Sequence, residues 1–157
     1  MILSNVQTID VFVNSAKLND LKILHLSDLH INKKTNLENV QKLVNLCNDL
    51  VFDFCVITGD IIDTKVKFIK EQLQILNTLK FKVYYISGNH DFFYGLEDLK
   101  NELSNFIFMD NSCKEFIYKN ETIFLAGLPD RFSKFFGIKR EEEKIKNYLL
   151  NEPSIFI

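Results

Sequence analysis

Three short clusters of polar residues combine side chains that commonly bind metal ions. The clusters are Asp28-Leu29-His30, Gly59-Asp60-Ile61-Ile62-Asp63 and Gly88-Asn89-His90-Asp91. Carboxylate oxygens together with imidazole nitrogens suit Mn, Fe or Zn better than Mg or Ca, which prefer shells of oxygen alone. The clusters therefore predict a site for a pair of divalent transition-metal ions.

The residue types indicate which side chains would bind the ions. Asp28 and His30 are two positions apart, a spacing that in extended chain places both side chains on one side. Asp60 carries two carboxylate oxygens, so it can bridge two ions. Asn89 adds a neutral carbonyl oxygen, which limits the negative charge that would repel a phosphate. We therefore predict Asp28, His30, Asp60 and Asn89 as the metal ligands.

Neighbouring residues complete the predicted site. His90 lies beside the expected ligands without being needed as one, so it is the candidate to protonate a leaving alkoxide. Asp63 and Asp91 are expected to orient neighbouring groups through hydrogen bonds. Gly59 and Gly88 permit backbone geometries that a Cβ atom would block.

A short apolar segment with the composition of a strand comes directly before each cluster. These segments span residues 21–26, 54–57 and 83–86. Helix-spaced apolar residues separate them, at Leu37, Val40, Val44, Cys47 and Val51 and again at Ile69, Leu73, Leu76 and Leu79. Because ligands of open α/β sheets bind just beyond the carboxyl ends of the strands, the clusters are expected to converge on one crevice. Each cluster alone also fits an ordinary turn or loop, and their joint occurrence after successive strands favours the site.

The remaining pattern predicts a layered α/β fold. Further strands are expected over residues 8–13, 106–109, 116–118, 122–126 and 155–157, a short helix over 95–103, and a helix marked by Ile138, Ile145 and Leu149. Strands that alternate with helices imply parallel pairing, right-handed crossovers and a sheet covered on both faces. The middle strands have no helices between them, which suggests an antiparallel extension or a second sheet.

Composition limits the possible partners and location. The 157 residues fit one domain, and a formal charge of -2 gives no basic surplus, so no nucleic-acid partner is expected. Three cysteines without a CxxC motif are expected to be reduced thiols, which suits the cytoplasm. The sequence shows neither a signal peptide nor an apolar run of the length that spans a bilayer. No feature indicates an oligomeric state.

Several residues outside the clusters have more than one interpretation. His25 is expected to be a packed or hydrogen-bonded core histidine. The aromatic residues after each of two expected strands, Phe92, Phe93 and Tyr94 and then Phe132, Phe135 and Phe136, are expected in the core. The alternative is that the first group shapes a pocket entrance, and that the second, beside Arg131 and Lys134, forms a rim that contacts lipid or an apolar substrate. Residues 139–144 are expected to form a solvated helix face.

The three clusters resemble the calcineurin-like metallophosphoesterase family. Its pattern is D-x-H, then G-D-x-x-D, then G-N-H-[DE], then a lone His after a strand, then G-H-x-H, and this chain matches the first three blocks in order. The resemblance implies that Asp28, His30 and Asp60 bind the first metal, that Asp60 and Asn89 bind the second, and that His90 is the catalytic histidine. It implies an α/β sandwich with layers α-β-β-α and a cofactor of two divalent ions, Mn, Fe or Zn.

The match departs from the family pattern after the third block. The chain has three histidines and none follows His90, so the last two blocks are missing. Residues 1–157 are therefore expected to be the N-terminal part of a single metallophosphoesterase domain, with a fold that is incomplete at the C-terminus. On this interpretation the chain alone is a weak or inactive catalyst, and a longer parent protein is the enzyme.

The resemblance implies hydrolysis of a phosphate ester or a pyrophosphate. The segment LKILHLSDLHI at residues 21–31 and Ala126-Gly127-Leu128-Pro129-Asp130 also resemble a subgroup with membrane-associated phosphoesterases and some UDP-diacylglucosamine pyrophosphatases. That subgroup implies a phosphorylated small molecule or a nucleotide-linked lipid as substrate and leaves peripheral membrane contact open. The alternatives are a non-catalytic binding module that keeps the fold, and a nuclease of the same superfamily, against which the acidic balance argues.

Overall fold

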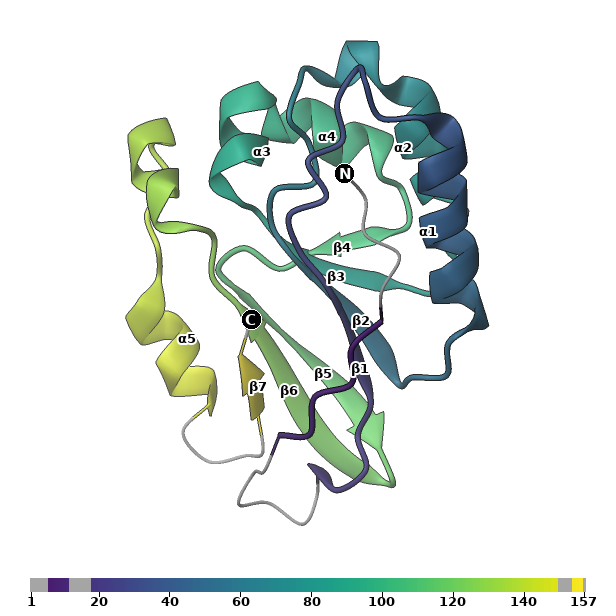
Figure 1. The fold of residues 1–157 in the computed structure, drawn as a ribbon. Helices are drawn as coiled ribbons and strands as arrows, with labels where there is room; N and C mark the ends of the chain where they lie inside the picture. The colour runs from purple at the N-terminus through teal and green to yellow at the C-terminus, as the bar shows by residue number, and fades with distance from the viewer. Residues whose placement is uncertain (1–5, 12–17, 150–153, 157) are drawn as a thin grey trace.

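The structure, a computed structural model, describes residues 6–11, 18–149 and 154–156. Its first sheet has four parallel strands in the order β1-β2-β3-β4, namely Ile23–Leu26, Phe54–Thr58, Val83–Ile86 and Phe106–Phe108. Since each strand runs in the same direction, the carboxyl ends of β1, β2 and β3 meet at one edge of the sheet (Figure 1).

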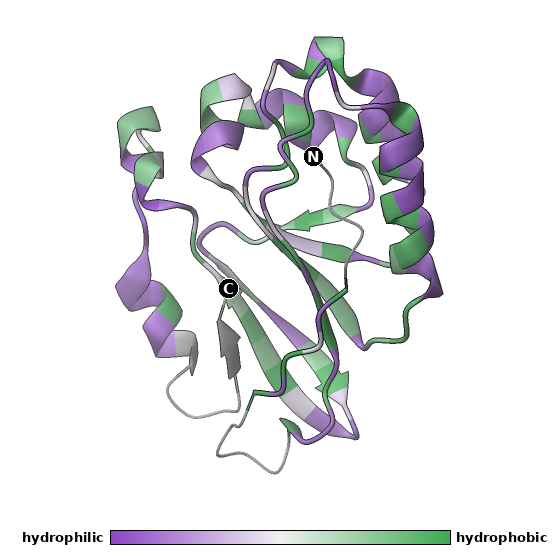
Figure 2. Cartoon of the chain, in the orientation of Figure 1, coloured by the Kyte–Doolittle hydropathy of each residue, from purple (hydrophilic) through white to green (hydrophobic). Residues whose placement is uncertain are grey.

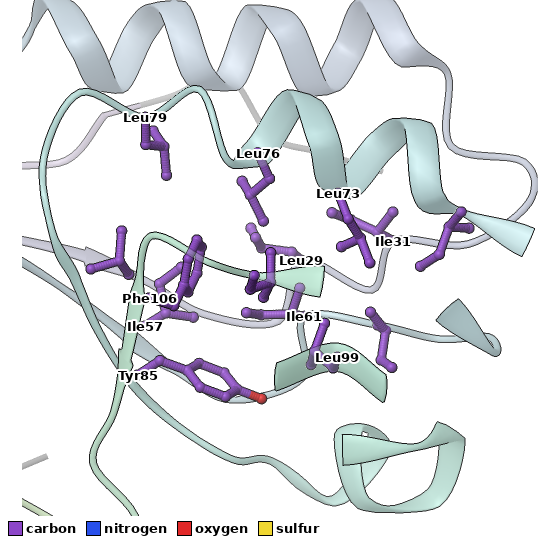
Figure 3. Close-up of a cluster of buried hydrophobic side chains, with 14 of the residues drawn as sticks. Leu29, Ile31, Ile57, Ile61, Leu73, Leu76, Leu79, Tyr85, Leu99 and Phe106 are labelled. Carbon is purple, nitrogen blue, oxygen red and sulfur yellow. The ribbon is translucent and has the colours of Figure 1, made fainter. Parts of the chain in front are cut away.

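Helices cover one face of this sheet. The longest is α1, Leu37–Asp49, which begins where the Asn36 side chain accepts a hydrogen bond from the Glu38 amide. It is followed in the chain by the 3-10 turn η2, Val66–Phe68, and by three shorter helices, α2 (Lys70–Leu76), α3 (Asn89–Tyr94) and α4 (Leu96–Glu102). The core between helices and sheet is almost entirely aliphatic, with Tyr85 as its buried hydroxyl-bearing side chain (Figure 3).

A second sheet packs on the other face. It has the order β5-β6-β7, with β5 (Ser112–Tyr118) antiparallel to β6 (Glu121–Gly127) and β7 (Ser154–Phe156) parallel to β6. Phe54 and Val56 of β2 meet Leu125 of β6 in a core between the sheets. The 3-10 turn η3, Arg131–Phe136, follows β6, and α5, Glu142–Leu149, places Ile145 against Ala126. The layers are therefore helix, sheet, sheet and helix, as the sequence predicted.

Most predicted elements are confirmed, with several differences. Ile138 lies before α5, which begins at Glu142, and not on that helix as predicted. Residues 8–11 form no strand, and residues 12 and 13 lie outside the described part of the chain. The cluster Gly88-Asn89-His90-Asp91 opens a helix, α3, rather than a loop. His25 is not a core residue: it is exposed on β1, although its Nε2 lies 2.7 Å from Thr58 Oγ1. The side chains of Phe93, Phe132, Phe135 and Phe136 are exposed, so the core interpretation of these four phenylalanines is wrong.

All three cysteines are unpaired, as expected, and Cys47 and Cys55 are buried. Burial raises the pKa of the Cys47 thiol to about 11, so this group stays a protonated apolar filler at neutral pH. Among the described residues, no helix combines the length and apolarity that crossing a membrane requires.

The ends of β2 and β3 approach each other through two glycines. Gly59 has φ +83°, and a Cβ atom built there would lie 2.6 Å from Gly88 Cα and 2.8 Å from Gly88 N. A Cβ built on Gly88 would overlap the backbone and side chain of Asp60. Neither position tolerates a side chain, so the two glycines set how closely the two clusters can lie.

We expect Gly59→Ala to destabilise the fold by about 2–5 kcal/mol. About 1–2 kcal/mol comes from the left-handed backbone and the remainder from overlap with Gly88. Gly137→Ala is the matched control, because Gly137 has φ +76° but no atom lies within 4 Å of a built Cβ. Urea unfolding followed by circular dichroism measures both, and equal losses for the two variants would contradict the close approach.

Candidate metal centre

The three sequence clusters meet at the carboxyl edge of the first sheet. Asp28 follows β1, Asp60 follows β2 and Asn89 follows β3, and all three line one cavity of about 420 Å³. The structure therefore brings together in space what the sequence placed at three separate strand ends.

Asp28, His30 and Asp60 form one candidate set of ligands. Each offers a ligand atom, and these atoms all lie within 4.8 Å of one another. The His30 Nε2 is 3.7 Å from Asp28 Oδ1. The backbone is not extended here, as the sequence argument had assumed, because φ is +54° at Asp28, +45° at His30 and +54° at Asp60. The left-handed turns, rather than strand alternation, aim these side chains at a common point.

A second candidate set shares His30 with the first. His30, Asp63 and His90 also offer ligand atoms within 4.8 Å of one another. The His90 Nδ1 lies 2.9 Å from Asp63 Oδ1, and the rings of His30 and His90 meet edge to face with centroids 4.6 Å apart. Asp63 is thus in place to orient the His90 ring.

The donor chemistry of the two sets fits divalent transition-metal ions. Each set mixes imidazole nitrogen with carboxylate oxygen, and four of the five side chains are partly buried while Asp28 is open to solvent. Such mixed shells disfavour Ca and Mg, which prefer oxygen ligands. The residues present therefore fit a metal of the Mn, Fe or Zn kind.

Asp91 ties two of the strand ends together from inside the protein. Its fully buried carboxylate accepts hydrogen bonds from the backbone amides of Asp60 (2.8 Å), Ile62 (3.2 Å) and Gly88 (2.9 Å). The Tyr85 hydroxyl donates a fourth, at 2.5 Å. The β2 and β3 loops consequently share one acceptor, which fixes the place of Asp60 relative to α3.

Burial governs the titration of this pair. It raises the pKa of Asp91, and the hydrogen bonds from Tyr85, Gly88, Ile62 and Asp60 oppose that rise. Burial is also the main reason that the pKa of Tyr85 lies well above its ordinary value. The charge of Asp91 is the second cause and raises this pKa further. The phenol therefore stays protonated and remains a donor to the carboxylate.

Further backbone bonds interlock the β1 and β2 loops. The Asp28 amide donates to Gly59 O, the His30 amide to Asp60 O, and the Ile31 amide to Ile61 O, over 2.8–3.3 Å. The His90 amide donates to Asp60 Oδ1 at 2.9 Å, so the Asp60 carboxylate is itself held in place. The candidate ligands thus lie on loops that are joined by backbone hydrogen bonds.

Part of the cavity lining comes from the segment after β6. It includes Leu128, Pro129 and Asp130, and Arg140 lines the cavity with them. The Arg140 Nη1 donates a hydrogen bond to Pro129 O at 3.1 Å. Its Nε lies within ion-pair distance of Glu142 Oε1, at 3.2 Å, but makes no hydrogen bond. One guanidinium therefore lines the cavity together with the carboxylates of Asp28, Asp60 and Asp130.

Sequence reasoning missed three of these residues. It grouped Arg140 with a solvated helix face, but Arg140 precedes α5 and its side chain is only 24% exposed. No spacing pattern could have found it, because the turn that carries it is irregular. Asp130 belongs to the segment 126–130, which resembles a family loop but predicted no role for this residue. Tyr85 was predicted only to be part of a strand.

Comparison with known proteins identifies a family. The family model described as calcineurin-like phosphoesterase matches residues 21–152. A protein of Campylobacter jejuni named uncharacterized metallophosphoesterase is 33% identical over 96 residues, which cover 60% of this chain and 25% of that protein. A Danio rerio protein named transmembrane protein with metallophosphoesterase domain is 27% identical over 89% of this chain and 35% of its own length. The chain thus spans about a quarter to a third of the length of these relatives.

A solved structure shares the fold. The NAD nucleotidase of Haemophilus influenzae superposes with a TM-score of 0.52 at 20% identity, over 72% of this chain and 27% of that one. This likeness supports the mixed α/β architecture with its parallel sheet and covering helices.

Removal of the Asp91 carboxylate should destabilise the protein strongly. Asp91→Ala leaves three buried amides and a buried phenol without their acceptor, and we expect a loss of about 3–5 kcal/mol in the free energy of unfolding. Asp49→Asn, at an exposed position on α1, is the matched control and should change the stability by less than about 0.5 kcal/mol. Urea denaturation measures the stability of both variants. A loss below about 1 kcal/mol for Asp91→Ala is on the order of a single exposed hydrogen bond, and it would refute the conclusion that Asp91 joins the β2 and β3 loops.

Proposed function

Since the chain belongs to the calcineurin-like phosphoesterase family, we propose that it carries part of the active site of a metal-dependent phosphoesterase that hydrolyses a phosphate ester or a pyrophosphate. The observation that supports this most directly is the convergence of Asp28, His30 and Asp60, with ligand atoms within 4.8 Å of one another, at a cavity also lined by Asn89.

The proposal assigns a role to each ligand. Asp28, His30 and Asp60 would hold one ion, and Asp60 and Asn89 would contribute to a second. Ions bound there supply Lewis acidity toward a phosphoryl oxygen and lower the pKa of a coordinated water. Two ions need more donors than these four side chains offer, and the matched part of this chain covers only 25% and 35% of the length of the two relatives. We therefore expect weak activity from this chain by itself.

His90 would act on the leaving group. Its Nδ1 lies 2.9 Å from Asp63 Oδ1, so an ionised Asp63 accepts a hydrogen bond from Nδ1 and fixes the ring. Nε2 is then the nitrogen that transfers a proton to a departing alkoxide. The Tyr94 ring packs next to the His90 ring, with 5.9 Å between the two centroids.

The cavity walls favour an anionic substrate. The Arg140 guanidinium would neutralise negative charge on the substrate opposite the metal ligands, and its planar donors match phosphate oxygens. We therefore propose a phosphorylated small molecule or a nucleotide-linked lipid as substrate, with a cytoplasmic location in keeping with the three unpaired cysteines.

Asp60→Asn should abolish the proposed metal site. We expect the Mn²⁺ affinity of the chain to fall on the order of 100-fold or more, since a neutral amide replaces the carboxylate shared by both ions. Isothermal titration with Mn²⁺ measures this, with Asp49→Asn as a control of equal charge change. The same pair is then tested for Mn²⁺-dependent hydrolysis of p-nitrophenyl phosphate. Hydrolysis that survives Asp60→Asn would remove the site assignment.

His90→Gln should slow the reaction in proportion to the difficulty of the leaving group. We expect kcat to fall about 10²–10⁴-fold for an alkyl phosphate and much less for p-nitrophenyl phosphate, because nitrophenolate departs without a proton. Equal falls for both substrates would contradict the proton-donor role and leave His90 a positioning residue.

A further inference from the structure

An exposed aromatic surface lies next to the cavity. It comprises Phe132, Phe135 and Phe136 of η3, whose side chains are 47%, 68% and 43% exposed. The turn η3 directly follows the cavity-lining residue Asp130. Figure 2 shows the hydrophobic residues of α3 and of the neighbouring turn on the same side of the molecule.

The aromatic surface is held rigidly. The Asp130 side chain accepts a hydrogen bond from the Phe132 amide, and the buried Ser133 donates from Oγ to Ile138 O. The Phe136 ring stacks on Phe92 of α3, with centroids 5.5 Å apart. Phe132 and Phe135 contact each other, with centroids 4.9 Å apart. The exposed rings are therefore presented by a fixed scaffold, which lowers the entropic cost of binding a surface.

Cations are interleaved with these rings. Residues 131–140 contain Arg131, Lys134, Lys139 and Arg140 and no acidic residue, in a chain whose net charge is -2. Arg131 and Lys134 are exposed, and neither forms an ion pair within the described part of the chain. The Lys134 Nζ instead lies 5.0 Å from the Phe135 ring centroid. Exposed phenylalanines and unpaired cations thus share one short turn.

We propose that the aromatic surface, together with Arg131 and Lys134, binds the interface of an anionic lipid bilayer. Aromatic rings enter the boundary between headgroups and acyl chains, while Lys and Arg stay at the level of the anionic headgroups. The lysine favours a bilayer over a protein partner, because Lys is depleted in the centres of protein interfaces. This binding needs neither metal nor catalysis, so it stands apart from the proposed hydrolysis. If both hold, the cavity opens beside the membrane and receives phosphorylated groups presented there.

Sedimentation with vesicles tests the proposal. The probe is a vesicle of phosphatidylcholine with about one third phosphatidylglycerol, compared with phosphatidylcholine alone, at about 0.15 M salt so that distant charges are screened. We expect binding to the anionic vesicles, weakened about 25-fold by Lys134→Glu, since each elementary charge near the surface contributes about fivefold. Phe135→Ser should weaken it about tenfold or more through the lost apolar contact.

Two matched variants control for charge and exposure. Lys82→Glu makes the same charge change at the amino end of β3, and Ile117→Ser removes an apolar side chain that is 76% exposed on β5. Both should bind anionic vesicles like the unaltered protein, and circular dichroism should show that all four variants fold. The proposal is overturned if vesicles of either composition fail to bind, if the two compositions bind equally, or if the control variants weaken binding as much as Lys134→Glu and Phe135→Ser. It is also overturned if Phe135→Ser instead dissolves a dimer seen by analytical ultracentrifugation while vesicle binding is absent, which would assign the surface to a second copy of the chain.

Discussion

The Asp91 carboxylate is the interaction on which the rest of the site depends. It is fully buried, where an isolated charge is unfavourable, and four hydrogen-bond donors surround it. Three of them are backbone amides from two different loops, so one side chain joins the ends of β2 and β3. The Tyr85 hydroxyl donates the fourth hydrogen bond. Its ring lies in the core between the helices and the first sheet (Figure 3). Asp60 and His90 occupy their positions as a consequence of this junction.

Sequence reasoning recovered the parts of the site that follow from regular structure. Parallel strands with apolar cores were visible in residues 54–57 and 83–86, and polar residues after such strands must share an edge. The spacing argument for Asp28 and His30 reached the right neighbourhood for the wrong reason, because left-handed backbone rather than extended chain brings the two together. Such conformations depend on hydrogen bonds between loops distant in sequence, such as that from the His30 amide to Asp60 O, which no local pattern records.

The cavity has two walls of different origin, and they differ in how far the sequence could predict them. Asp28, Asp60 and Asn89 line the cavity from the carboxyl ends of β1, β2 and β3, which the topology of a parallel sheet brings to one edge. The other wall is a turn and an irregular segment after β6, where Arg140 is positioned by a bond to Pro129 O. The same segment exposes phenylalanines that composition assigned to the core, because hydrophobicity does not report whether a turn lies over the sheet or beside it. Arg140 and the exposed phenylalanines, which would decide the substrate and the surface that the protein contacts, therefore lie in an irregular segment that hydrophobic periodicity cannot predict.

We propose that Asp28, His30, Asp60 and Asn89 hold metal ions in common. Crystals of the protein grown with Mn²⁺ and measured at the manganese absorption edge would locate bound manganese in the anomalous difference map. We expect anomalous density between Asp28, His30 and Asp60, bordering Asn89, that disappears in Asp60→Asn. Density confined to other places on the surface, or the same density in Asp60→Asn, would contradict it.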